Sequence, residues 1–255
     1  MKFKHRINIF LYNQILEALN INSVVSKNII GYKFIRRDIV FDFDRTFDSN
    51  FPKNQEFKFI QIGGNDGVSF DTLYSKVTGR NSIGLILEPS PRYFEKLQLN
   101  YQNFKSIKLL PFAIFEKSGS LELFELNEIG LKNHPYWAAG IGSVDINHLT
   151  NLDVKMEEIE RVKVDGITFD DLLGLHPEFL NIDYLQIDTE GYDFQILSYI
   201  NFQKFNAKMI KFEFKNLSAS EQKKAISIFR KDYFLYQDEL DLVCIRKNLR
   251  IKCRI

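Results

Sequence analysis

The sequence is poor in cysteine: only Cys244 and Cys253 occur among its 255 residues, and no CxxC pair exists. These two residues do not make a disulfide framework or a cysteine zinc site, so we expect a reducing, cytoplasmic compartment. Charge of one sign is also lacking, because 34 Lys and Arg residues balance 33 Asp and Glu residues. Without a basic excess, the chain is not expected to be a general nucleic-acid binder.

A long apolar run is absent as well. No stretch reaches the roughly 18 apolar residues of a transmembrane helix. Polar residues interrupt the N-terminal apolar segment and no small-residue cleavage site follows it, which argues against a signal peptide. We expect a helix near residues 7–19 that docks on the domain. A membrane-surface helix, with Lys2, Lys4 and Arg6 ahead of its apolar face, is the alternative.

Aromatic residues are abundant, with 24 Phe and 11 Tyr but a single Trp. Hydrophobic residues at 45% and charged residues at 26% are typical of a globular protein, which excludes disorder for most of the chain. A chain of this length buries a core without disulfides or metals. Phenylalanine in this quantity fills a large core or lines a pocket, and composition alone leaves both open.

The chain divides by pattern into an N-terminal part, residues 1–56, and a regular part, residues 57–255. The first part is predicted to be a helical extension that ends in a linker at 48–55, a segment rich in turn-forming residues. In the second part, strands alternate with helices. The predicted strands are 57–62, 82–88, 106–114, 120–126, 161–167, 182–188, 207–214, 233–237 and 240–246. One predicted helix follows the first strand and ends near residue 77. The other predicted helices span 90–103, 168–175, 193–200 and 218–231.

This alternation predicts an α/β fold with an open, mostly parallel sheet and helices on both of its faces. The last two strands form a hairpin, which inserts an antiparallel strand beside the last parallel strand. That arrangement is expected of the seven-stranded, Rossmann-like sheet of class I methyltransferases rather than of dinucleotide oxidoreductases. Segment 127–160 breaks the rhythm and is predicted to be an insertion in this domain.

The first candidate site is the turn Gly63-Gly64-Asn65-Asp66-Gly67, which follows the first strand of the sheet. Glycines let a backbone pass close to a ligand, and the helix that follows offers free N–H groups. The pyridine-nucleotide fingerprint GxGxxG is not met, because Ile62 stands at its first glycine. A smaller nucleoside such as S-adenosylmethionine is therefore favoured over a pyrophosphate. A tight turn without a ligand is the alternative.

Carboxylates follow two other strands. Glu88 ends the second strand, 25 residues after Gly63, and one carboxylate can accept hydrogen bonds from both hydroxyls of a ribose. Asp188 and Glu190 follow the 182–188 strand in the sequence IDTEG, where they can bind substrate hydroxyls, act as a base or hold a cation. The alternatives are a surface or capping role for Glu88 and helix capping by Asp188 or Thr189.

Five segments, in order from Phe57 to Phe214, together resemble the FkbM-type methyltransferase family. They are FIQIGGNDG, LILEPSPRYFEKLQLNY, LLPFAI, VDGITFDDLL and IDYLQIDTEGYDFQIL. The resemblance implies a methyltransferase dependent on S-adenosylmethionine, and members mostly O-methylate hydroxyls of sugars or secondary metabolites. One departure is Gln61, where such enzymes often carry Asp. The change removes a charge near the methionine ammonium group, although Gln61 can still hydrogen-bond to it.

The resemblance also assigns roles to individual residues. It implies that the methionine end of the cofactor is bound by Gln61, Gly63, Asn65, Asp66 and Gly67. It implies that Glu88 binds the ribose and that Phe112 and Ala113 lie near the adenine. Asp188 and Glu190 are implied to face the methyl-transfer centre. The acceptor is expected against segment 127–160, where Tyr136, Trp137 and Ser143 suit a sugar ring and His148 is a candidate general base. A Mg²⁺ site formed by Asp188, Glu190 and Glu213 is a further interpretation, and pairing of Glu213 with a lysine is its alternative.

The sequence thus predicts an S-adenosylmethionine-dependent O-methyltransferase that acts on a sugar, a glycan or a related small metabolite in glycan biosynthesis. An enzyme of the same fold that methylates a nitrogen, a lipid or a protein is one alternative, and a non-catalytic nucleoside-binding module is another. A peripheral membrane contact, a homo-oligomer and the role of residues 1–56 are left open.

Overall fold

The computed structural model describes residues 40–69, 71–135, 138 and 140–254. The helix predicted near 7–19 and the basic residues at the N-terminus lie outside this range, as do Tyr136 and Trp137. No helix in the described part of the chain is long and apolar enough to cross a membrane.

The main sheet has seven strands in the order β11-β12-β10-β9-β2-β3-β4. Strand β12 runs antiparallel to both of its neighbours and the other pairs are parallel. The fold predicted from the sequence, a class I methyltransferase sheet closed by an antiparallel hairpin, is confirmed. The strands are β2 (Glu56–Ile62), β3 (Asn81–Leu87), β4 (Ile107–Leu110), β9 (Asn181–Ile187), β10 (Asn206–Glu213), β11 (Tyr233–Asp238) and β12 (Asp241–Arg246).

The order of the strands reverses between β2 and β9. The chain runs outward from β2 through β3 to β4, and then returns to the other side of β2 with β9 and β10. In open α/β sheets, a ligand binds outside the carboxyl ends of the strands at such a switch point. The turns that follow β2, β3 and β9 carry the candidate residues, so the topology brings them to one edge.

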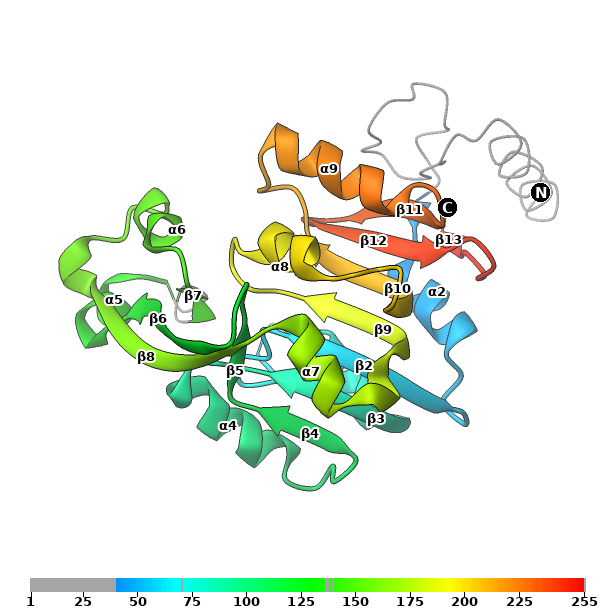
Figure 1. Ribbon diagram of the computed structural model, residues 1–255, viewed down its shortest axis with the longest axis horizontal. Coiled ribbons are helices and arrows are strands. Elements are labelled where there is room, and N and C mark those ends of the chain that lie inside the picture. The colour runs from blue at the N-terminus through cyan, green and yellow to red at the C-terminus, as the bar shows by residue number, and fades with distance from the viewer. Residues whose placement is uncertain (1–39, 70, 136–137, 139, 255) are drawn as a thin grey trace.

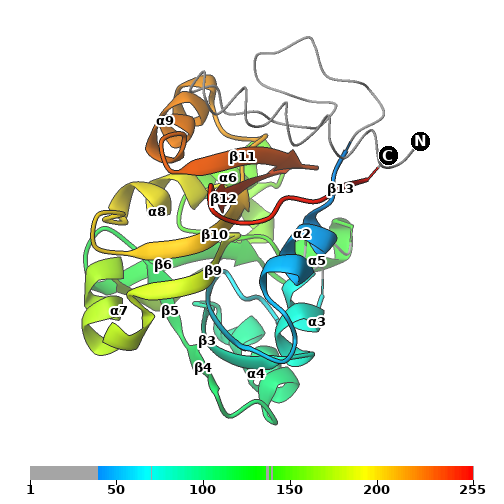
Figure 2. The same cartoon turned by 90° about the vertical axis from the view of Figure 1, so that its right-hand side faces the viewer.

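Helices cover both faces of this sheet, α7, α8 and α9 on one and α2, α3 and α4 on the other (Figure 2). Their bounds are α2 (Phe43–Asn50), α3 (Leu73–Thr78), α4 (Pro91–Tyr101), α7 (Phe169–Leu175), α8 (Asp193–Tyr199) and α9 (Ala219–Phe229). Side chains alternate along β2, so that Ile60 and Ile62 face α7–α9 while Phe57 and Phe59 face α2–α4. Many of the phenylalanines are therefore core residues, with Phe47, Phe57 and Tyr184 in mutual ring contact.

A second, smaller sheet stands beside the carboxyl edge of the first, with the order β5-β8-β6-β7 (Figure 1). It consists of β5 (Phe112–Ile114), β6 (Gly119–Leu126), β7 (Gly142–Ser143) and β8 (Ile159–Ile167), and it carries α5 (Glu128–Asn133), α6 (Ile146–Asn151) and the 3-10 turn η2 (Met156–Glu158). A second 3-10 turn, η3 (Pro177–Phe179), precedes β9. The insertion predicted at 127–160 is thus part of a larger layer with a small core of its own around Leu126 and Leu149.

The prediction of a single strand at 106–114 is wrong. Pro111 separates β4, which belongs to the main sheet, from β5, which belongs to the second sheet. Proline has no N–H to give to a sheet and constrains the residue before it, so the strand ends there. The consequence is functional, because the break carries Phe112 and Ala113 over the carboxyl edge of the main sheet.

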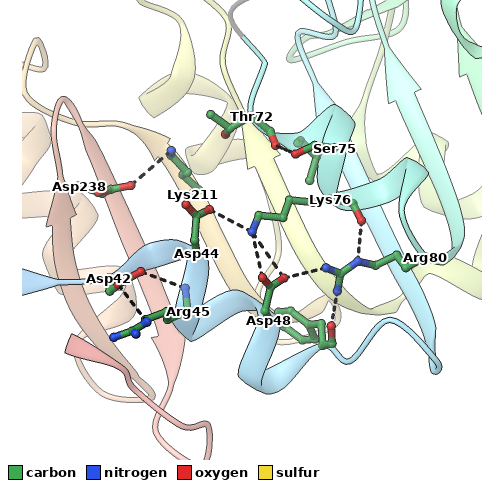
Figure 3. A network of polar contacts seen from close by, with 12 residues as sticks. Asp42, Asp44, Arg45, Asp48, Thr72, Ser75, Lys76, Arg80, Lys211 and Asp238 are labelled. Atoms are coloured by element: carbon green, nitrogen blue, oxygen red, sulfur yellow. Dashed lines mark hydrogen bonds and ion pairs between the residues drawn. The ribbon is translucent and has the colours of Figure 1, made fainter. Parts of the chain in front are cut away.

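The segment 48–55, predicted to be a linker, contains the end of α2 and the buried Phe51. Ion pairs attach α2 to α3 and its exit, with Asp44 Oδ1 3.0 Å from Lys76 Nζ and Asp48 Oδ1 2.9 Å from Arg80 Nη2 (Figure 3). The short strand β1 (Val40–Phe41) pairs with β13 (Cys253–Arg254). Residues 48–50 are therefore helical and Phe51 is a core residue, whereas the division of the chain at residue 56 stays a prediction.

Candidate active site

A cavity of about 260 Å³ lies at the carboxyl ends of β2, β3 and β9, and residues of the second sheet close it. Most of the predicted site residues line this cavity. From the main sheet and its turns come Gln61, Gly63, Asn65, Glu88, Asp188 and Glu190, and from the second layer Phe112, Ala113, Leu123, Glu125 and Gly142. Gln61 and Glu190, which are 129 positions apart in the sequence, thus line the same cavity.

The glycine turn owes its shape to close backbone packing. Gly63 has φ +83°, and a Cβ built on it would lie 1.8 Å from the carbonyl oxygen of Asp188. Its N–H donates to Leu87 O at 3.0 Å, so the turn contacts the exits of both neighbouring strands. Only glycine fits this position, because other residues would clash with the β9 backbone.

Two predicted members of the turn do not line the cavity. The Asp66 carboxylate accepts hydrogen bonds from Val68 N at 2.9 Å and Ser69 N at 2.7 Å, and so closes the turn on itself. Gly67 packs against Leu97 and Tyr101. Their contacts are structural, whereas Gly63 and Asn65 face the cavity.

Glu88 is 7% exposed and held by two backbone donors. Asn65 N donates to its Oε2 at 2.7 Å and Ser90 N donates to its Oε1 at 2.8 Å. A carboxylate has about four acceptor positions, so acceptors remain for the hydroxyls of a ligand. Burial raises the pKa of Glu88 to about 7, and the nearby Glu125 carboxylate adds to the rise. The surface-acid interpretation of Glu88 is excluded.

Glu125 is a cavity residue that the sequence analysis missed. It lies on β6 at 2% exposed, and its Oε2 accepts a hydrogen bond from Ser90 Oγ at 2.7 Å. Arg92 Nη2 lies 3.7 Å from its other carboxylate oxygen. A signal was present, because strict alternation in β6 puts Glu125 on the same face as Leu121 and Leu123. A carboxylate on a strand face that is otherwise apolar indicates a residue with a specific partner or ligand.

The turn after β9 presents Asp188 and Glu190. Helix α8 begins at Asp193 with Tyr192 as its N-cap and without a side-chain cap bond, so the capping interpretation of Asp188 and Thr189 is wrong. Glu190 has φ 51°, a conformation uncommon for residues other than glycine, Asn and Asp. The fully buried Asp193 holds the turn, because its carboxylate accepts from Thr189 N at 3.1 Å, Thr189 Oγ1 at 2.9 Å and Glu213 N at 3.1 Å.

Both carboxylates of this turn have raised pKa values. Asp188 is exposed at the mouth of the cavity and the Glu190 side chain is partly exposed, but protein atoms crowd both carboxylates. Burial, followed by the carboxylates of Asp241, Asp71 and Glu213, raises the pKa of Asp188 to about 7. Burial and then the Asp188 charge raise the pKa of Glu190 to about 8. These two groups can therefore exchange protons near neutral pH.

The lining of the cavity is acidic. Carboxylates come from Asp71, Glu88, Glu125, Asp188 and Glu190, and no Lys or Arg is among the described lining residues. Clustered carboxylates resist simultaneous ionisation, so a cation lowers the energy of the charged state. The cavity thus favours cationic or neutral ligands over anionic ones.

These raised pKa values predict how stability changes with pH. Between about pH 4 and the raised pKa values, folded Asp188 holds a proton that the unfolded chain releases, so the free energy of unfolding falls as pH rises. We expect Asp188→Asn to reduce this fall and to make the unliganded protein more stable than wild type at about pH 8.5. Urea denaturation at about pH 5.5 and about pH 8.5 measures the free energy of unfolding of both proteins, with exposed Asp170→Asn on α7 as control. Equal pH dependence of Asp188→Asn and wild type would contradict the prediction.

Other candidates lie around the cavity rather than in its wall. His148, on α6, packs over the turn, with Nε2 3.9 Å from Glu190 Oε2, and a Cβ built on Gly191 would lie 2.2 Å from its Nδ1. Burial lowers the pKa of His148. Ser143 is buried in β7, and its Oγ accepts a hydrogen bond from Asp145 N at 3.3 Å. Neither residue lines the cavity, although Gly142 and Val144 do.

The interpretation of a metal site gains no support from the geometry. Within the described ranges, no group of three or more His, Cys, Asp or Glu residues is placed to hold a metal ion. Glu213 does not line the cavity, and its Oε1 accepts from Asn216 Nδ2 at 2.5 Å.

The model of the family described as "Methyltransferase FkbM domain" matches residues 61–241. "Methyltransferase 1" of Beauveria bassiana (strain ARSEF 2860) is 28% identical over 172 residues, which are 65% of this chain and 66% of that protein. The chain thus spans just under two thirds of the length of this curated relative.

Solved structures of methyltransferases are also similar. Methyltransferase FkbM from Methylobacillus flagellatus KT has 14% identity and a TM-score of 0.44, covering 78% of this chain and 48% of that one. The METTL16 MTase domain has 10% identity and a TM-score of 0.42, covering 79% and 64%. M. capricolum TrmK in complex with S-adenosyl-homocysteine has 14% identity and a TM-score of 0.36, covering 81% and 67%.

Proposed function

The chain belongs to the FkbM methyltransferase domain family, and from this membership we propose that it is an S-adenosylmethionine-dependent O-methyltransferase acting on a sugar, a glycan or a related small metabolite. One observation carries the proposal. Glu88 after β3 and the Asp188–Glu190 turn after β9 face one cavity at the switch point of the sheet. The cytoplasmic location, glycan biosynthesis and absence of nucleic-acid binding stay predictions.

The residues of the cavity suit the cofactor. In this proposal Glu88 accepts from the ribose hydroxyls, Phe112 and Ala113 form an apolar wall for adenine, and Gly63 and Asn65 lie at the methionine end. All five residues line the cavity. The acidic lining complements a sulfonium cation. When bound, S-adenosylmethionine supplies an electrophilic methyl group on its sulfur.

The proposed chemistry needs alignment and a proton acceptor. Holding the acceptor oxygen in line with the methyl group can contribute roughly 7–11 kcal/mol to lowering the barrier in favourable systems. A carboxylate oxygen of Asp188 then takes the proton of the acceptor hydroxyl, for which a pKa of about 7 is suited. Glu190 can receive a second hydroxyl of the same acceptor. His148, outside the lining, positions the Glu190 turn in this proposal.

The acceptor is proposed to be uncharged. Its side of the cavity is formed by Gly140, Gly142 and Val144 together with the Asp188–Glu190 turn. The described lining offers no Lys or Arg to neutralise a phosphate or a carboxylate, whereas sugar hydroxyls find acceptors there. Stacking of a sugar on Tyr136 and Trp137, and a contact with Ser143, stay predictions.

Removing the Glu88 side chain is expected to weaken cofactor binding. A hydrogen bond to a charged group contributes about 1.5–3 kcal/mol, so Glu88→Ala should raise the Kd for S-adenosylhomocysteine about tenfold or more. Calorimetry measures the Kd and thermal unfolding verifies the fold, because Glu88 also holds Asn65 and Ser90. The exposed Glu122→Ala on β6 is the control. An unchanged Kd in folded Glu88→Ala would refute the ribose assignment.

The function itself is tested by transfer of a labelled methyl group. The purified chain and labelled S-adenosylmethionine are incubated with fractionated cell extract or with surface-glycan precursors, and labelled products are analysed by mass spectrometry. A methyl ether on a neutral carbohydrate supports the proposal. Label on a nitrogen, a lipid or a protein supports the same-fold alternative, and cofactor binding without any transfer supports the binding module.

A further inference from the structure

Gln61, Asp71 and Gln186 form one side of the cavity, here called its floor, and this floor contains a buried oxygen without a hydrogen-bond partner among the described residues. Gln61, near the end of β2, is 1% exposed and lines the cavity. Its Nε2 donates to Asp71 Oδ2 at 2.9 Å, which turns its Oε1 the other way, and this buried oxygen makes no hydrogen bond with any described group. A buried acceptor left unpaired is costly, so a ligand donor is expected there.

The neighbouring Asp71 carboxylate is held in place by several donors. Leu73 N donates to its Oδ1 at 2.7 Å, and the side chain of Gln186 also hydrogen-bonds to it. Gln186 is oriented in turn by Tyr184 Oη, which donates to Gln186 Oε1 at 3.1 Å. Asp71 and Gln186 both line the cavity, like Gln61. Asp71 forms no ion pair with any described Lys, Arg or His.

Such a floor fits an ammonium group. An ammonium has donors only, and this part of the cavity offers one unpaired amide oxygen and one carboxylate that forms no ion pair with a described residue. Burial raises the pKa of Asp71, and a bound cation would favour its charged form. A neutral hydroxyl would satisfy Gln61 Oε1 but would give the hydrogen-bonded Asp71 carboxylate no ion-pair partner, so the amine is the better match.

We propose that Asp71, together with Gln61 Oε1, binds the amino group of the methionine moiety of the cofactor. Asp71 then supplies, from the segment before α3, the negative charge that Gln61 lacks at the end of β2. This assignment rests on the proposed function, since it places the S-adenosylmethionine cofactor in the same cavity. The two acidic ends of the site have separate tasks, with Glu88 at the ribose and Asp71 at the amine.

The test compares two ligands that differ at this end. S-adenosylhomocysteine carries the amino acid group, whereas methylthioadenosine keeps the nucleoside and lacks it. In calorimetry on the full chain, Asp71→Asn should weaken S-adenosylhomocysteine about tenfold or more and leave methylthioadenosine within about twofold. The double variant Gln61→Asp with Asp71→Asn returns one charge to the floor and should recover most of the lost affinity. Asp66→Asn, in the same loop but outside the lining, is the matched control.

The affinities of the variants for the two ligands distinguish the assignment of Asp71 from the proposed function. Selective loss for S-adenosylhomocysteine with recovery in the double variant supports the assignment. Unchanged affinity in Asp71→Asn, or equal weakening of both ligands, overturns it and leaves the proposed function intact. If the unaltered chain binds neither ligand, the proposed function fails and this assignment fails with it.

Discussion

The Asp188→Asn variant is expected to lose about 10²–10⁴-fold in the rate of methyl transfer while its cofactor affinity changes little. Asparagine keeps the size of the side chain but cannot take a proton from a hydroxyl. Asp188 follows β9 directly, with its N–H bonded to Ile62 O at 2.9 Å, so its backbone is fixed independently of the carboxylate. The substitution therefore removes the base without moving the turn.

The measurement uses single-turnover transfer of labelled methyl to the extract fraction that accepts it. Calorimetry on the same preparations reports cofactor affinity, and the exposed Asp170→Asn on α7 serves as the isosteric control. Glu190→Gln is expected to act mainly on the binding of the acceptor, which appears in KM. If Asp188→Asn turns over at the wild-type rate, Asp188 is not the base.

Gly63→Ala is expected to disrupt the cofactor site and to lower the free energy of unfolding of the protein. At φ +83°, a residue with a Cβ costs roughly 1–3 kcal/mol in strain alone. The added Cβ would also lie 1.8 Å from Asp188 O and 2.7 Å from Asp188 C, so the β9 exit would have to move. We expect a loss of at least about 3 kcal/mol in the free energy of unfolding, together with loss of cofactor binding.

A second glycine gives the matched control. Gly174 lies in α7, where an added Cβ would meet nothing within 4 Å. Alanine in a helix is favoured over glycine by about 0.5–1 kcal/mol, so Gly174→Ala should stabilise the protein by that amount. Urea denaturation of both variants measures the difference. Similar effects of the two substitutions would show that the turn is not packed against β9 as described.

The sequence predicted the alternation of strands and helices because parallel strands buried on both faces are short apolar runs, such as SIGLILE before Glu88. It also predicted that Glu88 and Asp188 share one site, because each follows such a strand and the carboxyl ends of parallel strands meet at one edge. The second sheet was not anticipated as a unit. Its strands β5 and β8 pair over about fifty residues, and local pattern carries no information on such pairing.

Other residues escaped prediction because their roles depend on distant contacts. Asp71 lies in an ordinary helix-preceding segment, and its place in the cavity lining follows from folding, which brings it against Gln61. Asp193 resembles an acidic residue in the first turn of a helix, yet it is fully buried beneath Thr189 and Glu213 N. Phe51 stands among turn-forming residues, and its burial depends on the packing of α2.

The central claim, that this cavity binds S-adenosylmethionine, is tested most directly by calorimetric titration of the unaltered chain with S-adenosylhomocysteine. We expect saturable binding of S-adenosylhomocysteine below millimolar concentration, and a Kd about tenfold or more higher in Glu88→Ala. Absence of binding up to millimolar ligand, in a chain whose folding is verified by circular dichroism, would contradict the claim.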